Sequence, residues 1–327
     1  MDTKLIVSAS PHLRSEETTT GLMANVIVAL TPCVVASAII FGLRALLVTA
    51  VSVVACVAFE WLYCKLMKKP CKTYDLSACV TGVLLAFVCP VTIPYWTIIL
   101  GDFFAIVLVK MLFGGLGKNI VNPALAGRAF MFSWPVLMSN WVKVGFENAA
   151  GLISSADAVT AATPLANLHQ GVMCTESTAA LFLGNVGGCL GETSALLLLI
   201  GFAYLLIRKV ISARIPVTYI LTVAVLTFLF PRGNDRIAWM AAQVFGGGLM
   251  LGAIFMATDY VTSPVTHLGQ IVYAIGCGVL TVMIRYFGGY NEGVSYAILC
   301  MNACTVLLDK IGHPVKFGAP KKEAAKK

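Results

Sequence analysis

The dominant pattern along the chain is a series of long apolar runs separated by short polar segments. A helix needs about 20 apolar residues to cross the hydrocarbon core of a bilayer, and about ten runs approach or reach that length. They lie at roughly 22–42, 45–65, 75–90, 94–113, 122–138, 193–207, 215–230, 237–257, 268–286 and 293–308. The pattern predicts an all-α integral membrane protein with about ten transmembrane helices.

Composition supports this class. Of 327 residues, 59% are hydrophobic and 12% are charged, whereas soluble domains carry about 25% charged residues. The net charge of +8 does not indicate nucleic-acid binding, because the basic residues gather at the ends of apolar runs and in the C-terminal tail. The lipid bilayer is therefore the expected environment.

The distribution of Lys and Arg predicts the orientation, because cytoplasmic loops are enriched in them. With the N-terminus inside, 17 of the 23 basic residues fall in cytoplasmic segments or at cytoplasmic helix ends. This places both termini in the cytoplasm, with a basic tail at 311–327, and the long segment 139–192 outside.

A sequence repeat divides the membrane part in two. Pro90-Val-Thr92 recurs as Pro264-Val-Thr266, and Phe113-Gly-Gly115 as Phe287-Gly-Gly289, both at an offset of 174 residues. Five predicted spans separate the copies, so the halves 21–138 and 193–310 would be inverted five-helix repeats. Such repeats form binding sites near broken helices at their interface.

The polar run Asp157-Ala-Val-Thr160-Ala-Ala-Thr163-Pro-Leu165 lies in the extracytoplasmic segment. From its residues alone it indicates a capped turn: Asp157 can accept backbone hydrogen bonds, and Pro164 disfavours helix at Thr163. It also resembles a flavinylation motif, in which the last threonine carries FMN through a phosphoester bond. Thr160-Ala161 replaces the commoner Ser-Gly, and the acceptor Thr163 is retained.

That motif belongs to the membrane family comprising the D-type subunits of Rnf complexes and the B-type subunits of sodium-pumping NADH:quinone reductases. The resemblance covers nearly the whole chain, and the short segment of about 20 residues before the first apolar run favours the Rnf branch. It implies covalent FMN on Thr163, with Asp157 and Thr160 beside it, and attachment by a flavin transferase.

A second stretch, Gly117-Lys-Asn119-Ile-Val-Asn122-Pro123, follows a glycine-rich break. Asn122 before Pro123 is a typical start of a helix, which we expect to run to about Leu137. A plain helix start satisfying its own amides explains these residues equally well. The resemblance implies instead that Asn119 and Asn122 lie near a second, non-covalent flavin, riboflavin.

The stretch Thr258-Asp259-Tyr260-Val-Thr262 is the other part that resembles the family. Asp259 and Thr262 are candidate cofactor-binding residues at the cytoplasmic end of the eighth apolar run, although Asp259 also fits a loop carboxylate without a role. Tyr260 stands where the family usually has proline, which affects the turn.

Glu60, Asp102 and Arg128 are the ionisable residues placed most clearly inside apolar runs. A charge in hydrocarbon is costly, so each should face a partner or a cavity. Either Glu60 or Asp102 lines an ion path, or Arg128 pairs with one of them as a structural ion pair. The glycine-rich stretch 184–192 suggests a re-entrant turn facing a phosphate, or tight helix packing.

Eleven scattered cysteines and four histidines show no ligand spacing, so no metal site is expected. The chain also lacks a dinucleotide-binding glycine motif after a strand. The resemblance therefore implies separate partners: iron–sulfur membrane subunits, another covalent-FMN subunit and a peripheral NADH-binding subunit.

Two functions remain open from the sequence. One is an electron-carrying subunit of a prokaryotic inner-membrane complex that couples ferredoxin:NAD electron transfer to Na⁺ or H⁺ export. The other is a passive transporter of the urea or ammonium channel type, which would need no flavin acceptor at Thr163.

Overall fold

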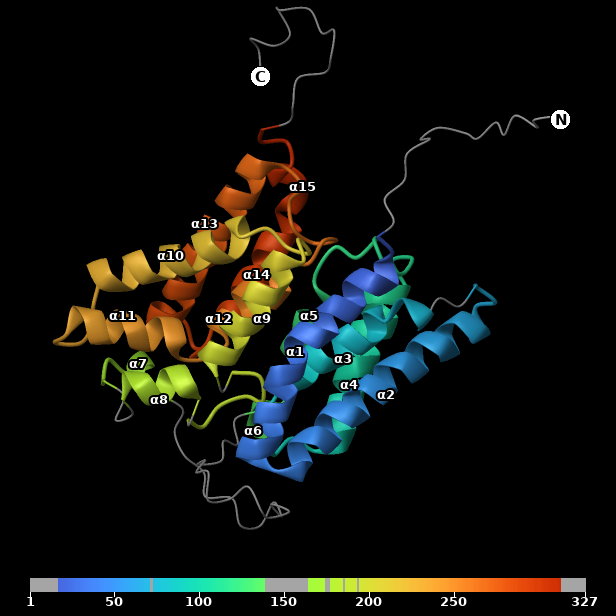
Figure 1. Ribbon diagram of the computed structural model, residues 1–327, viewed down its shortest axis with the longest axis horizontal. Helices are drawn as coiled ribbons and strands as arrows, with labels where there is room; N and C mark the ends of the chain where they lie inside the picture. Colours follow the sequence, from blue (N-terminus) through green and yellow to red (C-terminus); the bar gives the residue numbers. More distant parts are fainter. Residues whose placement is uncertain are drawn as a thin grey trace, which may run out of the picture.

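The computed structural model describes residues 17–70, 73–138, 164–173, 177–184, 186–192 and 194–312. Within these ranges the regular elements are all helical (Figure 1). Asp157, Thr160 and Thr163 lie outside the described residues, as does the tail from residue 313.

The first half of the sequence contains two long helices followed by shorter ones. They are α1 (Thr19–Phe41), α2 (Leu43–Leu66), the 3₁₀ turn η1 (Thr73–Asp75), α3 (Ser77–Phe87), α4 (Tyr95–Phe103), the π-helical η2 (Phe104–Met111), α5 (Pro123–Met131) and α6 (Pro135–Met138).

The second half begins with two short helices, α7 (Pro164–His169) and α8 (Thr178–Leu183). It continues with α9 (Ala195–Ile207), α10 (Arg214–Leu229), α11 (Arg236–Phe245), α12 (Leu249–Leu251), the π-helical η4 (Gly252–Met256), α13 (His267–Phe287), α14 (Val294–Ala303) and α15 (Thr305–Leu308).

Three described helices, α1, α2 and α13, are long and apolar enough to cross a bilayer. A fourth span arises if α11 and the following Leu249–Met256 count together, although they are bent by 60°. Helices α3, α9, α10 and α14 are apolar but shorter. The helical membrane class is thereby supported, while the number ten stays a prediction.

Local sequence explains where the first helices begin and end. Thr18 caps α1 by accepting a hydrogen bond from the amide of Gly21, and Gly42, with φ of 79°, separates α1 from α2. The predicted start at Asn122-Pro123 is confirmed, because the Asn122 side chain accepts from the amides of Ala124 and Leu125.

Two expected helices have different extents. The run 122–138 was expected to be one helix to about Leu137, but α5 ends at Met131 and a turn precedes α6 at Pro135. Proline explains the interruption, because it cannot donate the next helical hydrogen bond. The run 237–257 is broken at Gly246-Gly247-Gly248, between α11 and α12.

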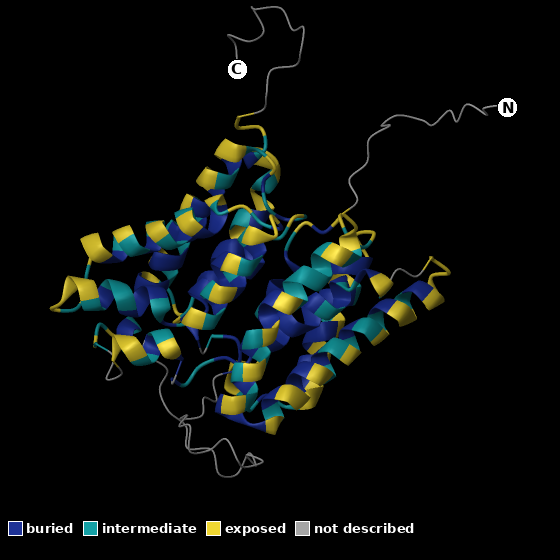
Figure 2. Ribbon diagram, in the orientation of Figure 1, coloured by how far each residue is buried: buried dark blue, intermediate teal, exposed yellow. Residues whose placement is uncertain are grey.

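Close helix contacts join the two halves. A Cβ on Gly201 of α9 would lie 2.6 Å from the carbonyl oxygen of Ala29 on α1, so only glycine permits this approach. Within the first half, Gly82 of α3 permits a similar approach to α2, since a Cβ there would lie 2.8 Å from the Cα of Val53. Figure 2 shows buried faces turned inward and exposed residues on the outer faces of α1 and α2. Apolar side chains such as Val35 and Val54 are exposed there, as expected of surfaces that contact lipid.

Candidate functional site

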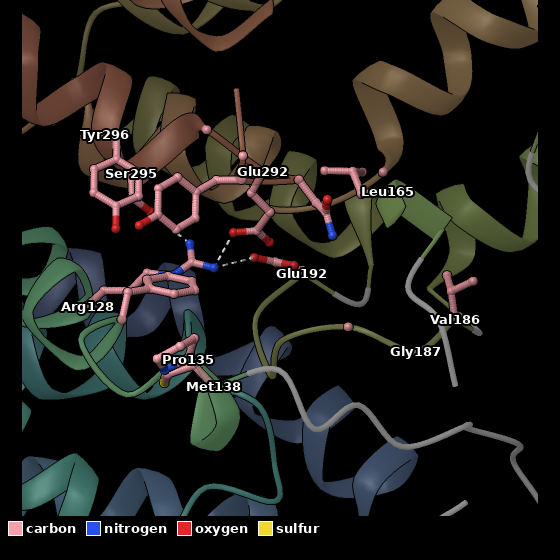
Figure 3. Close-up of a pocket in the computed structure, with 18 of the residues that line it drawn as sticks. Arg128, Pro135, Met138, Leu165, Val186, Gly187, Glu192, Glu292, Ser295 and Tyr296 are labelled. Atoms are coloured by element: carbon pink, nitrogen blue, oxygen red, sulfur yellow. Dashed lines mark hydrogen bonds and ion pairs between the residues drawn. The ribbon is translucent and has the colours of Figure 1, made fainter. Parts of the chain in front are cut away.

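A cavity of about 250 Å³ with charged side chains in its wall lies between the two halves (Figure 3). Its walls come from α5, the loop 186–192, the glycine break after α11, the loop before α14, and the first turn of α7. We call it the outer cavity. Its charged and hydroxyl-bearing lining residues are Arg128, Glu192, Glu292, Ser295, Tyr290 and Tyr296.

Arg128 is the centre of this cavity. It is 2% exposed, and its Nη1 donates to Ser295 Oγ at 2.8 Å. Its Nη2 forms an ion pair with Glu292 and lies 3.8 Å from Glu192 Oε1. Its Nε has no hydrogen-bond partner within the described structure. One buried cation therefore faces two carboxylates.

A second buried arginine, Arg285, stabilises the loop that carries Glu292. Arg285 of α13 donates from Nε to the backbone oxygen of Glu292 at 3.0 Å and from Nη1 to Gln243 Oε1 at 3.0 Å. Its Nη2 reaches the carbonyl of Gly246 at 3.3 Å. These bonds anchor the loop before α14 to the end of α11, and they satisfy backbone carbonyls that the helix break leaves free.

Aromatic rings and glycines shape the rest of the outer cavity. The rings of Tyr290 and Tyr296 lie 4.8 Å apart between centroids, and Phe132 lies 5.8 Å from Tyr290. Gly247 has φ of +69°, and a Cβ there would come within 3.0 Å of the Leu165 side chain. The cavity thus offers flat apolar walls with a single cationic edge.

The loop 186–192 is fixed by the end of α3. The amides of Leu190 and Gly191 donate to the carbonyls of Cys89 and Phe87 at 3.1 and 2.8 Å, and the Cys189 thiol donates to Val88 at 3.2 Å. These bonds pair carbonyls at the C-terminal end of a helix. The stretch is therefore a tightly packed loop between α8 and α9.

The segment after Thr163 reaches the outer cavity. The described chain resumes at Pro164, and the side chain of Leu165, 3% exposed, lines the cavity. In Figure 1, α7 lies at the edge of the molecule away from α15.

A second, smaller cavity of about 80 Å³ brings three predicted residues together. Asn119, Asn122 and Asp259 all line it, with Lys110 and Ser77. Asn122 Nδ2 donates to the carbonyl of Met256 at 3.2 Å, while Asn119 Oδ1 is buried without a hydrogen-bond partner among the described residues. We call this the inner cavity.

Asp259 and Thr262 form a local turn. The Thr262 hydroxyl donates to Asp259 Oδ2 at 3.1 Å, and the amide of Val261 approaches Oδ1 at 3.5 Å. Burial raises the pKa of Asp259, and these two hydrogen bonds act in the opposite direction. Thr262 is 2% exposed and supports Asp259 from behind the inner cavity, while Tyr260 is exposed.

The two acids expected inside spans have separate partners. Glu60 pairs with Lys110 Nζ at 3.0 Å, and Lys110 also donates to Ser77 Oγ at 2.6 Å. Asp102 is fully buried and accepts from Ser52 Oγ at 2.7 Å and Cys56 Sγ at 3.2 Å. Its Oδ2 has no partner within the described ranges.

The alternative in which Arg128 pairs with Glu60 or Asp102 is wrong. Arg128 faces the outer cavity, and its carboxylate partners are Glu192 and Glu292. Both lie next to a glycine outside the regular helices, where an acid usually indicates a solvated turn. One sequence feature could have indicated both acids: each lies in a glycine-rich stretch just before an apolar run.

The long apolar helices indicate a helical integral membrane protein, and its two candidate sites lie where the halves meet. The chain belongs to the NQR2, RnfD, RnfE family, whose sequence profile matches residues 6–318.

Similar proteins match over almost their full length. The chain is 48% identical over 321 residues to the D subunit of the Na⁺-translocating ferredoxin:NAD⁺ oxidoreductase complex of Acetobacterium woodii, covering 97% of this chain and 96% of the relative. It is 45% identical to the D subunit of the proton-translocating counterpart of Clostridium ljungdahlii (95% and 96% covered). It is 36% identical to the D subunit of an ion-translocating oxidoreductase complex of Stutzerimonas stutzeri (91% of each).

Proposed function

We propose that this chain is the flavin-carrying membrane subunit of an Rnf-type complex, which couples ferredoxin:NAD electron transfer to Na⁺ or H⁺ export. Family membership and the names of relatives at 48% and 45% identity support the assignment to the D-type subunits. Those relatives are named for sodium and for protons respectively, so either ion fits the family.

Covalent FMN on Thr163 is the central element of the proposal. The observation that carries it is the position of Leu165, two residues after Thr163, in the wall of the outer cavity. Two residues of extended chain reach at most about 7 Å. A cofactor attached at the Thr163 hydroxyl therefore starts close to this cavity. Asp157 and Thr160 remain candidate neighbours of the attachment point.

The outer cavity fits an isoalloxazine ring chemically. Phe132, Tyr290 and Tyr296 offer flat surfaces for a planar ring. The glycines in the wall have no side chains, so a ligand can approach the backbone there. The unpartnered Nε of Arg128 is a donor for a ring carbonyl or ring nitrogen. Bound FMN would supply electron storage and transfer. The chain would position the ring, restrict water and provide one positive charge.

The inner cavity is the proposed place of riboflavin. The buried carbonyl oxygen of Asn119 fits an N–H donor such as the one on an isoalloxazine ring. Asn122 holds the wall by capping α5, and Asp259 with Thr262 closes the cytoplasmic end. This cavity measures about 80 Å³ against about 250 Å³ for the outer cavity, so a whole flavin requires outward movement of lining side chains.

Ten spans in two inverted repeats are part of the proposal, with both termini cytoplasmic. At the offset of 174 residues, α4 with η2 falls on α13, α5 overlaps α14, and α1 overlaps α9. Glu60 and Asp102 are the proposed ion-path residues, since both are buried acids within helix α2 or α4. The other Rnf subunits and a flavin transferase are the proposed partners.

In-gel fluorescence of the denatured complex tests this function. A fluorescent band at the position of this chain is expected for wild type and for Thr160→Ala, and its absence for Thr163→Ala. A band that persists in Thr163→Ala refutes the attachment site. No band in wild type favours the passive-transporter alternative instead.

A further inference from the structure

The outer cavity contains two carboxylates placed unusually close together. The oxygens of Glu192 and Glu292 and the Cys189 sulfur lie within 4.8 Å of one another. Glu192 approaches from the loop before α9, and Glu292 from the loop before α14 (Figure 3). Their side chains are 4% and 18% exposed. Two carboxylates at this distance interact strongly, so their protons titrate as a pair.

The two carboxylates are not equally satisfied. Glu292 is in direct contact with the Arg128 guanidinium, whereas Glu192 lies 3.8 Å from it. Glu192 Oε1 accepts no hydrogen bond within the described structure although its side chain is buried. An ionised carboxylate with one buried oxygen that accepts no hydrogen bond is costly in such a place. Glu192 is therefore the member of the pair on which a proton is best accommodated.

The two described arginines near the pair already interact with other groups. Arg128 is shared between both acids, and Arg285 is held by carbonyl oxygens and Gln243. The thiols of Cys89 and Cys189 face the pair from the end of α3 and from the loop. Within the described ranges, Tyr290 and Tyr296 are further titratable residues in the cavity wall. With both arginines and both glutamates charged, the set is neutral.

Among the described residues, no cation is therefore left to neutralise a further negative charge in this cavity. We propose that the Glu192–Glu292 pair takes up one proton from water when a redox cofactor in the outer cavity gains an electron. The electron goes to the cofactor, and the proton goes to a carboxylate oxygen of the pair, so the total charge of the cavity is unchanged. This inference rests on the proposed function, because it requires the Thr163-linked flavin in this cavity.

Redox-difference infrared spectroscopy of the purified complex tests the proton uptake. Reduction of wild type should produce the carbonyl stretch of a new protonated carboxyl group. This signal should be absent from Glu192→Gln, in which an NH₂ group replaces one carboxylate oxygen. It should also be absent from Thr163→Ala, which removes the cofactor. Asp309→Asn is the matched control, since Asp309 caps the distant Val265–Thr266 turn, and it should keep the signal.

A second measurement distinguishes loss of proton uptake from misfolding of the variant, because it is made only on protein that carries the flavin. The reduction potential of the fluorescent, covalently bound flavin should depend on pH in wild type, and Glu192→Gln should lose about one proton per electron from that dependence. Glu292→Gln serves as a second variant. A wild-type flavin band without a new carboxyl signal overturns the proton uptake alone, as does a signal that persists in both variants. Absence of the flavin band from wild type overturns the proposed function, and the proton uptake with it.

Discussion

Arg128 on α5 donates a hydrogen bond to Ser295 on α14 at 2.8 Å, which joins two short helices from opposite halves of the sequence. Both helices begin inside the protein, and both contribute to the outer cavity. The pair of halves is thus held together by a buried charged group as well as by apolar packing.

Replacing Arg128 should destabilise the protein strongly. Arg128→Met leaves Glu192 and Glu292 buried without their shared cation, and breaking a buried pair in this way costs about 3–5 kcal/mol. Thermal unfolding of the purified complex should show the loss, with Arg208→Met at the exposed end of α9 as the control. The double variant Arg128→Met/Glu292→Gln should recover part of the stability; equal loss in both would contradict this account.

Glu60 and Lys110 should behave as a coupled pair in stability. Either single neutralisation strands a buried charge, so Glu60→Gln and Lys110→Met should each lower the yield of assembled complex. The double variant should assemble better than either. If Glu60 also lies on the ion path, cation transport stays low in the double variant although assembly returns. Full recovery of transport would assign Glu60 a structural role only.

Asp102 offers a cleaner test of the ion path. Asn at this position keeps an oxygen to accept from Ser52 and Cys56, so Asp102→Asn should preserve folding and flavin content. Cation transport per electron should fall. Ser52→Ala removes one donor but keeps the carboxylate, and it should leave transport closer to wild type. Normal transport in Asp102→Asn would remove this residue from the path.

Alanine variants of the two asparagines in the inner cavity should affect different properties, one the stability of the protein and the other its riboflavin content. Asn122→Ala removes the cap of α5, which costs about 1 kcal/mol, and the bond to Met256. Asn119 Oδ1 makes no hydrogen bond in the described structure, so Asn119→Ala should leave stability near wild type while lowering extractable riboflavin. Unchanged riboflavin in Asn119→Ala would argue against the assignment.

Cysteine labelling of whole cells tests the orientation. In a variant without native cysteines, a cysteine near Lys143 should react with an impermeant thiol reagent, because the Lys and Arg distribution predicts that this segment lies outside. A cysteine in the 321–327 tail should react only after the membrane is opened. The reverse pattern would show that the predicted orientation is wrong. It would also contradict the attachment of FMN outside the cytoplasm.

Apolar runs and composition were sufficient to predict the helical membrane class, and the capping pair Asn122-Pro123 predicted the start of α5. Helix ends were harder to predict, because Pro135 and the Gly246–Gly248 break interrupt runs whose hydropathy is continuous. The sequence also indicated Asn119, Asn122 and Asp259, which the fold brings to one cavity. Glu192 and Glu292 escaped notice because burial of a loop acid depends on helices far away in the sequence.

The contacts at the end of α3 constrain the order of events during synthesis. Cys189 donates to Val88 across a separation of 101 residues, and the neighbouring amides of Leu190 and Gly191 complete the same carbonyl row. Until the ribosome has made that loop, the last turn of α3 has unpaired carbonyls in an apolar setting. The end of α3 thus reaches its final form only after the chain as far as Gly191, just before α9, has been made.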